Sequence, residues 1–108
     1  MDASNNEIDS IGLELAALTR LHTLRLSFNH ISSVATFAHP DMASAMRRLT
    51  NLNLAHNNIS DLTGLETLTM LSVLDLCDNR LSELTQLQPL TQLDWLRDLA
   101  LQGMCVIL

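Results

Sequence analysis

The chain has 108 residues, room for one domain, and its 47% hydrophobic content suffices for a buried core although aromatic residues make up only 3%. Its six basic residues, all arginine, stand against twelve acidic ones. The resulting net charge of −6 excludes the basic face that nucleic acid or an anionic membrane surface requires, and favours a protein partner with basic character. No uninterrupted apolar run reaches the length of a membrane span.

One short phrase, L-x-x-L-x-L-x-x-N-x-I/L, recurs along the chain with full copies that begin at Leu21, Leu49 and Leu71. Leucine alternates with other residues around the middle of each copy, so we expect a short strand with one buried face there. The asparagine amide both donates and accepts hydrogen bonds, so it can satisfy backbone groups in the interior where the chain turns. We therefore predict a hydrogen-bonded column of side chains, the asparagine ladder, made of Asn6, Asn29, Asn57 and Asn79.

The segments between the predicted strands show a different spacing. Ile59, Leu62, Leu65 and Leu68 recur every three residues, which favours a 3₁₀ or irregular helical return over a long α-helix. One step between ladder asparagines is lengthened by residues 38–47, where a Pro-Asp pair precedes Ala- and Met-rich sequence. We expect a capped helical turn there in place of the usual return.

From Leu49 onward the sequence reads L-x-x-L-x-L-x-x-N-x-I-x-x-L-x-x-L-x-x-L. This resembles the twenty-two-residue subclass of leucine-rich-repeat proteins, which includes the leucine-rich-repeat regulator of type-one protein phosphatase, an axonemal dynein light chain and a spliceosomal ribonucleoprotein subunit. The resemblance implies an α/β solenoid, a right-handed superhelix with a short parallel sheet on its concave face and 3₁₀ or irregular helical returns on its convex face. The predicted single domain, 1–108, divides into a partial repeat 1–20, repeats 21–48, 49–70 and 71–95, and a partial repeat 96–108.

Both ends depart from the repeat. The chain begins in mid-repeat without a capping element, and Met104 stands where the last phrase would place an asparagine. Methionine cannot continue the ladder, so either the stack ends there or the solenoid continues beyond this sequence. Uncapped ends also favour self-association through end stacking or edge pairing.

The last four residues, Cys105-Val106-Ile107-Leu108, resemble a C-a-a-X signal for geranylgeranylation. Modification of Cys105 would make the chain a prenylated, membrane-peripheral adaptor. Val106 also fits a position of the repeat, and no polybasic stretch supplies the second signal that stable anchoring requires. Both interpretations of this tail stay open.

Equivalent positions of stacked strands fall into outward columns, which brings distant residues together. Phe28 and His56 are predicted neighbours on the ridge beyond the strands, and Phe28 is a large exposed apolar group there. Aromatic and arginine side chains contribute much of the energy of interfaces. The predicted contact residues are Arg25, Phe28, Asn53, His56, Asp75 and Asp78, with a solvated face without a partner as the alternative. For Trp95 we expect packing over the end of the stack, with an interface hot spot as the alternative.

A catalytic site is not predicted. His56 and Cys77 fall in adjacent repeats, but in different columns, and a strand face offers no pocket that excludes water. The histidines show no zinc-ligand spacing with Cys77 or Cys105, and no phosphate-binding glycine motif is present, so we expect no metal and no cofactor.

The expected function is that of a non-enzymatic adaptor or scaffold that binds a protein partner through its concave face. The resemblance implies a phosphatase-regulatory or an axonemal or cytoskeletal role. The polar, acidic start of the sequence lacks the pattern of a secretory signal, and two cysteines do not make cysteine-rich caps. We therefore expect a cytoplasmic location, with the cytoskeleton or cilium included.

Overall fold

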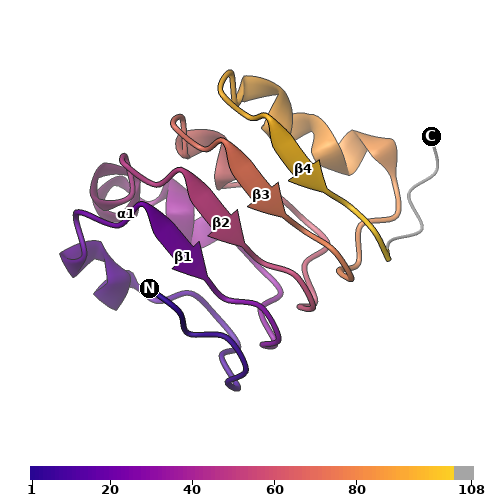
Figure 1. Cartoon of the computed structure of the whole chain (residues 1–108), viewed down its shortest axis with the longest axis horizontal. Coiled ribbons are helices and arrows are strands. Elements are labelled where there is room, and N and C mark those ends of the chain that lie inside the picture. Colours follow the sequence, from indigo (N-terminus) through magenta and orange to yellow (C-terminus); the bar gives the residue numbers. More distant parts are fainter. Residues whose placement is uncertain (104–108) are drawn as a thin grey trace.

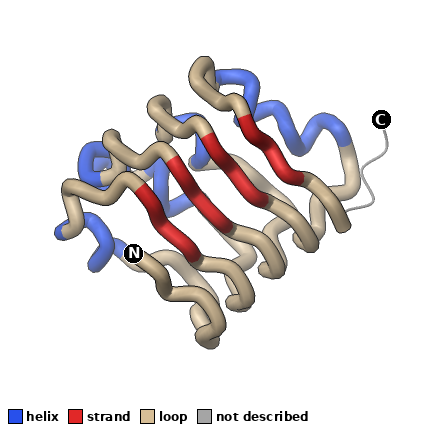
Figure 2. Tube along the Cα trace, viewed as in Figure 1, coloured by secondary structure: helices blue, strands red, loops and turns tan. Residues whose placement is uncertain are grey.

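The structure is a computed structural model that describes residues 1–103. Within this range four strands form one parallel sheet in the order β1-β2-β3-β4 (Figure 1). Helical returns connect the strands on one side of the sheet, so each strand lies beside the next one along the chain (Figure 2). This is the short parallel sheet that the repeat predicted. The strands are β1 (Thr23–Arg25), β2 (Asn51–Asn53), β3 (Val73–Asp75) and β4 (Asp98–Ala100).

The returns are mostly 3₁₀ helices, as the three-residue spacing of the leucines predicted. A 3₁₀ helix places every third side chain on one face, so a leucine at every third position is enough to fill the core side. In the return after β2, Leu62, Leu65 and Leu68 are each 0% exposed. The 3₁₀ helices are η1 (Leu13–Ala17), η2 (Ala35–Ala38), η3 (Leu65–Thr67) and η4 (Leu84–Gln92).

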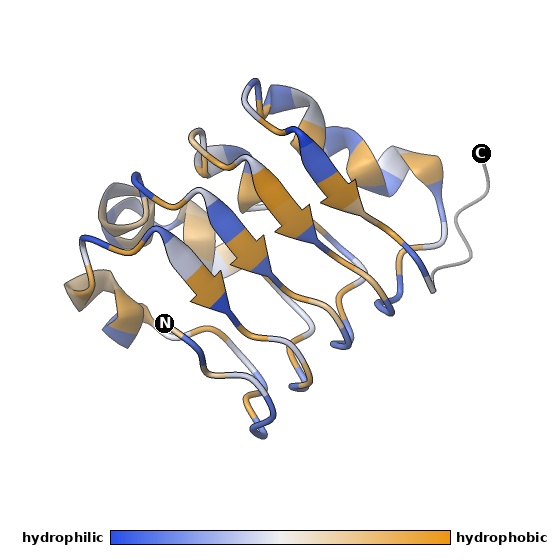
Figure 3. Ribbon diagram, in the orientation of Figure 1, coloured by the Kyte–Doolittle hydropathy of each residue, from blue (hydrophilic) through white to orange (hydrophobic). Residues whose placement is uncertain are grey.

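The core is a stack of aliphatic side chains between the sheet and the returns. The central residues of the first three strands, Leu24, Leu52 and Leu74, are paired in register and are 0%, 0% and 1% exposed. Their counterpart Leu99 in β4 is 38% exposed, because β4 is the outermost strand of the part that the structure describes. A hydrophobic band therefore crosses the four strands (Figure 3), and its last member, Leu99, is the exposed one.

The long step between β1 and β2 contains the helix α1 (Pro40–Ala45). His39 caps it, since its Nδ1 accepts a hydrogen bond from the Asp41 N–H at 3.2 Å, and Met42 and Met46 bury their side chains completely. The predicted capped helical turn is confirmed, but the expectation that it replaces the return is wrong. The return η2 is retained ahead of it, because its Phe37 fills the core with 0% exposure, and α1 is added afterwards.

The first residues of the chain add a partial strand outside β1. The Ala3 N–H donates to the Arg25 carbonyl at 2.8 Å, and the Arg25 N–H donates to the Met1 carbonyl at 2.9 Å. Asp2 and Arg25 form a parallel bridge. In residues 1–103, the helices are all too short or too polar to cross a membrane. The residues of the predicted C-a-a-X signal, Cys105 included, and Met104 lie outside the described residues.

Candidate interaction surface

The outward side chains of the strands form two rows across the sheet, which we call the strand face. The register of the strands aligns Arg25, Asn53, Asp75 and Ala100 in one row. A second row contains Thr23, Asn51, Val73 and Asp98. The structure thus brings three of the predicted contact residues, Arg25, Asn53 and Asp75, side by side on neighbouring strands.

Two side chains of the first row also brace the backbone where the strands end. Asn53 Oδ1 accepts the Ala55 N–H at 3.0 Å, and Asp75 Oδ1 accepts the Cys77 N–H at 3.0 Å. These are Asx turns, in which a short polar side chain bonds to the backbone two residues further on. Each turn fixes its side chain in one orientation. For Asp75 the second carboxylate oxygen remains outside this bond.

Three residues after each strand the chain passes through a left-handed turn. The residues at this position have φ values of 60°, 57°, 57°, 56° and 78°, although only the last is a glycine. Left-handed backbone is uncommon outside glycine, so a whole column of it is a repeated feature of the fold rather than one local irregularity. We call this column the ridge; it consists of Asn5, Phe28, His56, Asp78 and Gly103.

Three ridge side chains form a continuous contact. The rings of Phe28 and His56 stack with centroids 4.1 Å apart and an interplanar angle of 10°. On its other side, His56 Nε2 lies 3.3 Å from Asp78 Oδ2. Phe28 remains 50% exposed although its ring stacks on that of His56. The predicted proximity of Phe28 and His56 is confirmed, and Asp78 joins them through a contact with the His56 ring that column position alone did not reveal.

The positive group of the strand face has an acidic neighbour. Arg25 lies beside Asp2 in the partial strand. The pKa of the Asp2 carboxyl is lowered chiefly by hydrogen bonds from Ser4, with a smaller contribution from the charge of Arg25. At the other end of the surface, neither Asp75 nor Asp78 forms an ion pair with an arginine within residues 1–103.

The asparagine ladder lies directly beneath the ridge. Asn57 Nδ2 donates to the Leu26 carbonyl at 2.9 Å and to the Leu54 carbonyl at 3.0 Å, and its Oδ1 accepts the Ile31 N–H at 3.1 Å. Asn79 repeats this pattern one repeat later. The first member, Asn6, is exposed and bonds within its own turn. The ladder therefore holds each ridge residue against the neighbouring repeat.

Cys77 is the one cysteine within residues 1–103, and its thiol is free. Burial, followed by a hydrogen bond to Asp75, raises the pKa of Cys77. The His56 ring contacts Phe28 and Asp78. The hydrogen bond between His56 and Cys77 is a backbone one, in which the His56 N–H donates to the Cys77 carbonyl at 2.8 Å. His56 and Cys77 therefore do not form a thiol–imidazole pair.

Trp95 lies at the opposite end of the strands from the ridge. It borders a hollow of about 250 Å³ with Thr50, Met70, Ser72 and Arg97, just ahead of the strands. Its side chain is 56% exposed, so the expectation that it packs over the end of the stack is wrong. It is an exposed aromatic group well separated in the chain from Phe28.

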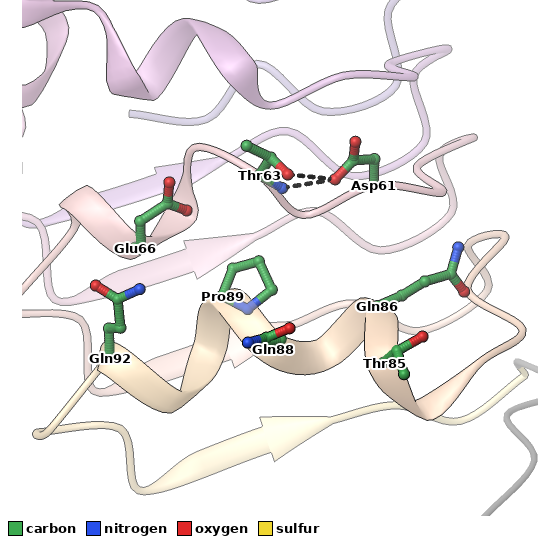
Figure 4. A pocket seen from close by; sticks show the side chains of 8 residues that line it. All are labelled: Asp61, Thr63, Glu66, Thr85, Gln86, Gln88, Pro89 and Gln92. Carbon is green, nitrogen blue, oxygen red and sulfur yellow. Dashed lines mark hydrogen bonds between the residues drawn. The ribbon is translucent and has the colours of Figure 1, made fainter.

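A second hollow, of about 290 Å³, lies between the returns η3 and η4 (Figure 4). Its two carboxylates are already engaged, since Asp61 accepts both hydrogen bonds of Thr63 and Glu66 accepts the Gly64 N–H at 2.8 Å. The bonds from Thr63 lower the pKa of Asp61. Among residues 1–103 no three His, Cys, Asp or Glu side chains gather as they would around a metal ion.

Comparison with known proteins agrees with this architecture. The family model for the leucine-rich repeat matches residues 48–68. An internalin (inlF) from Listeria monocytogenes str. 4b F2365 superposes with a TM-score of 0.72 and 29% identity, over 95% of this chain and 27% of that chain. The sequence thus spans about a quarter of that internalin's length. Internalin C2 (inlC2) of the same strain matches with a TM-score of 0.52 and 17% identity, over 98% of this chain and 72% of that chain.

A search of curated proteins finds no significant match. The repeated phrase, the parallel sheet with its 3₁₀ returns and the internalin structures all agree on the same architecture. Together these show an α/β solenoid fold built from leucine-rich repeats.

Proposed function

We propose that the chain is a non-enzymatic protein-interaction module that binds a protein partner through the strand face and the ridge. The observation that supports this most is the exposed contact of Phe28 with His56, which stands on a fixed backbone next to the carboxylate of Asp78. An exposed aromatic group with charged neighbours is the kind of anchor that dominates interface energies. The proposed contact residues are Arg25, Phe28, Asn53, His56, Asp75 and Asp78.

The rigidity of this surface favours binding. The backbone N–H of each ridge residue from Asn5 to Asp78 donates to a carbonyl of the next repeat, at 2.8 to 3.0 Å. Asx turns hold Asn53 and Asp75. A surface that is already ordered loses little conformational entropy when a partner docks, so more of the contact energy appears as affinity.

The same features favour a binding role over catalysis. A thiol nucleophile requires a thiolate, whereas burial raises the pKa of Cys77. The nearest imidazole, that of His56, is committed to the ridge contact. A phosphatase-regulatory role, or an axonemal or cytoskeletal role in the cytoplasm, rests on the resemblance of the repeat to the twenty-two-residue subclass. Asn57 and Asn79 of the ladder keep the spacing of that subclass.

An alternative role as a prenylated, membrane-peripheral adaptor is favoured by one sequence observation, the C-a-a-X pattern at Cys105. The intact mass of the protein isolated from its own cells tests it. A geranylgeranyl adduct on Cys105 supports the alternative, and an unmodified pool that remains in the aqueous phase on detergent partition rejects it.

Affinity capture with single-residue variants tests the interaction surface. The bait is the full chain as wild type, as Phe28→Ala and as Trp95→Ala. Both variants remove one exposed aromatic side chain, and the two side chains are similarly exposed, at 50% for Phe28 and 56% for Trp95. We expect a protein that wild type and Trp95→Ala retain and that Phe28→Ala loses by about tenfold or more.

Two results would contradict the proposal. Retention of the same proteins at the same level by all three baits would remove the ridge from any interface. Loss of a partner with Trp95→Ala alone would place the interface at the opposite end of the strands.

A further inference from the structure

The outward surface at the C-terminal end of the sheet is acidic and open. Asp75 and Asp98 border a hollow of about 360 Å³ over β3 and β4, together with Val73, Arg97 and Ala100. The hollow exists because the first row ends in Ala100, where the other strands carry longer side chains. Asp78 lies beyond Asp75, three residues along the chain on the ridge.

The charges of the surface are unequally distributed between its two ends. At the N-terminal end, Arg25 faces Asp2, so one positive and one negative group are adjacent. At the C-terminal end, the hollow is lined by two carboxylates, Asp75 and Asp98, and one arginine, Arg97, while Asp78 contacts His56 on the ridge. This end therefore keeps an excess of negative charge that a partner of positive charge would complement.

We propose that this sheet face receives a basic segment of a protein partner, with an arginine side chain in the hollow between Asp75 and Asp98. The inference rests on the proposed function and specifies the chemistry of its partner. Asp75 accepts from the backbone N–H and the thiol of Cys77, which leaves further acceptor positions on its carboxylate, and Asp98 is exposed, so both can accept from a guanidinium.

Arginine suits the surface better than lysine for two physical reasons. Its planar guanidinium donates through several N–H groups at once, which matches two carboxylates on adjacent strands. A guanidinium also stacks on aromatic rings, and a second arginine of the same segment has the half-exposed Phe28, which lies after β1 in contact with His56, as its partner. An ammonium group would satisfy only the charge.

An NMR titration tests the proposal with a defined ligand. The probe is a capped Gly-Arg-Gly-Arg-Gly peptide, added to the ¹⁵N-labelled full chain, with its lysine analogue as comparison. We expect amide shifts to concentrate at residues 73–78 and 97–100, and the arginine peptide to bind about two- to fivefold more tightly than the lysine peptide.

A pair of isosteric changes isolates the two carboxylates. Asp75→Asn and Asp98→Asn copy the residues that β2 already carries in the same rows, Asn53 and Asn51, so the Asx turn and the strand are preserved. The matched control is Glu14→Gln with Asp41→Asn, which removes the same number of charges from the returns η1 and α1. We expect the first double variant to weaken binding about three- to tenfold and the control to leave it within about 1.5-fold.

The outcomes separate this inference from the proposed function. Shifts centred on the returns, equal weakening in both double variants, or no shifts at all would overturn the basic partner. If affinity capture still showed a partner that depends on Phe28, the module would stand with a partner of different chemistry. If that dependence were also absent, both proposals would fall.

Discussion

At the residue scale, the ladder asparagines do more than fill the space beneath the ridge. The Leu26 carbonyl accepts from both Asn29 and Asn57, and the Leu54 carbonyl accepts from both Asn57 and Asn79. Each carbonyl is therefore shared by two successive repeats. The acceptor side is not shared, since the buried Ile31 N–H relies on Asn57 alone.

This asymmetry predicts the cost of removing one member. In Asn57→Ala the two carbonyls keep one donor each, whereas the Ile31 N–H loses its acceptor in the interior. We expect a loss of about 2–4 kcal/mol in the free energy of unfolding, from the unpaired donor and the vacated volume. Asn6→Ala, at the exposed end of the ladder, should cost about 0.5–1 kcal/mol. Urea unfolding followed by circular dichroism measures both, and equal losses would show that the ladder is not what holds the turn.

The thiol of Cys77 gives a pH-dependent prediction. Burial and Asp75 raise its pKa in the fold, so the thiol holds its proton more tightly in the folded chain than in the unfolded chain. That contribution to stability is complete below the ordinary thiol pKa of about 8.5 and is lost as pH rises through the folded value. We expect the rate of iodoacetamide alkylation in a Cys105→Ser background to reach half its maximum at a higher pH in the folded chain than in urea. Identical midpoints would contradict the shift.

The candidate surface could be predicted only in part from the sequence. The rows of the strand face and the proximity of Phe28 to His56 follow from repeat spacing, because parallel strands in register place equivalent residues side by side. The left-handed ridge, the Asx turns and the contact of His56 with Asp78 depend on backbone and side-chain torsions that spacing does not encode. The sequence does carry a signal for the Asx turns, because Asn53 and Asp75 each stand two residues before a small side chain.

At the element scale, the start of η3 depends on one close backbone approach. Gly64 has a φ of 114°, and a Cβ there would clash with the Val34 carbonyl oxygen next to the neighbouring return. Only glycine permits both the conformation and the contact. The sequence shows the glycine, but the contact becomes visible only when two returns are packed together.

Gly64→Ala should therefore be costly. We expect a loss of about 2–4 kcal/mol in the free energy of unfolding, since strained φ and a backbone clash add. Gly12→Ala is the control, because Gly12 has a φ of −91° and the added methyl would meet only the flexible Glu14 carboxylate. Its effect should stay below about 1 kcal/mol. Thermal unfolding of the two variants compares them, and a mild effect of Gly64→Ala would mean that η2 and η3 can move apart.

The insertion that forms α1 shows why element existence was easier to predict than element arrangement. The cap and the Pro-Asp start are local signals, and they correctly predicted a helical turn. Whether η2 survives ahead of α1 is decided by core volume, which Phe37, Met42 and Met46 fill together at 0% exposure. The sequence shows that these residues are apolar, but it does not show how they pack against one another.

At the scale of the whole molecule, the sheet keeps its register although the repeats differ in length. Leu24 pairs with Leu52 across the long step, as Leu52 pairs with Leu74 across the short one. The extra residues are accommodated on the side of the returns, where α1 packs against η1 and η2. The strand face is therefore regular while the opposite side varies, which suits a solenoid whose surface is built by repetition.

Within residues 1–103, β4 has a neighbouring strand on one side only, and its Leu99 is 38% exposed. An unpaired edge promotes pairing between chains, so we expect the 108-residue chain to self-associate reversibly as its concentration rises. Leu99→Lys should keep it monomeric, because a charge on an edge strand opposes pairing. Leu84→Lys, at a leucine that is 52% exposed on η4, should associate like wild type. Sedimentation velocity over a concentration series decides: a wild type that stays monomeric, or two variants that behave alike, would rule out association through β4.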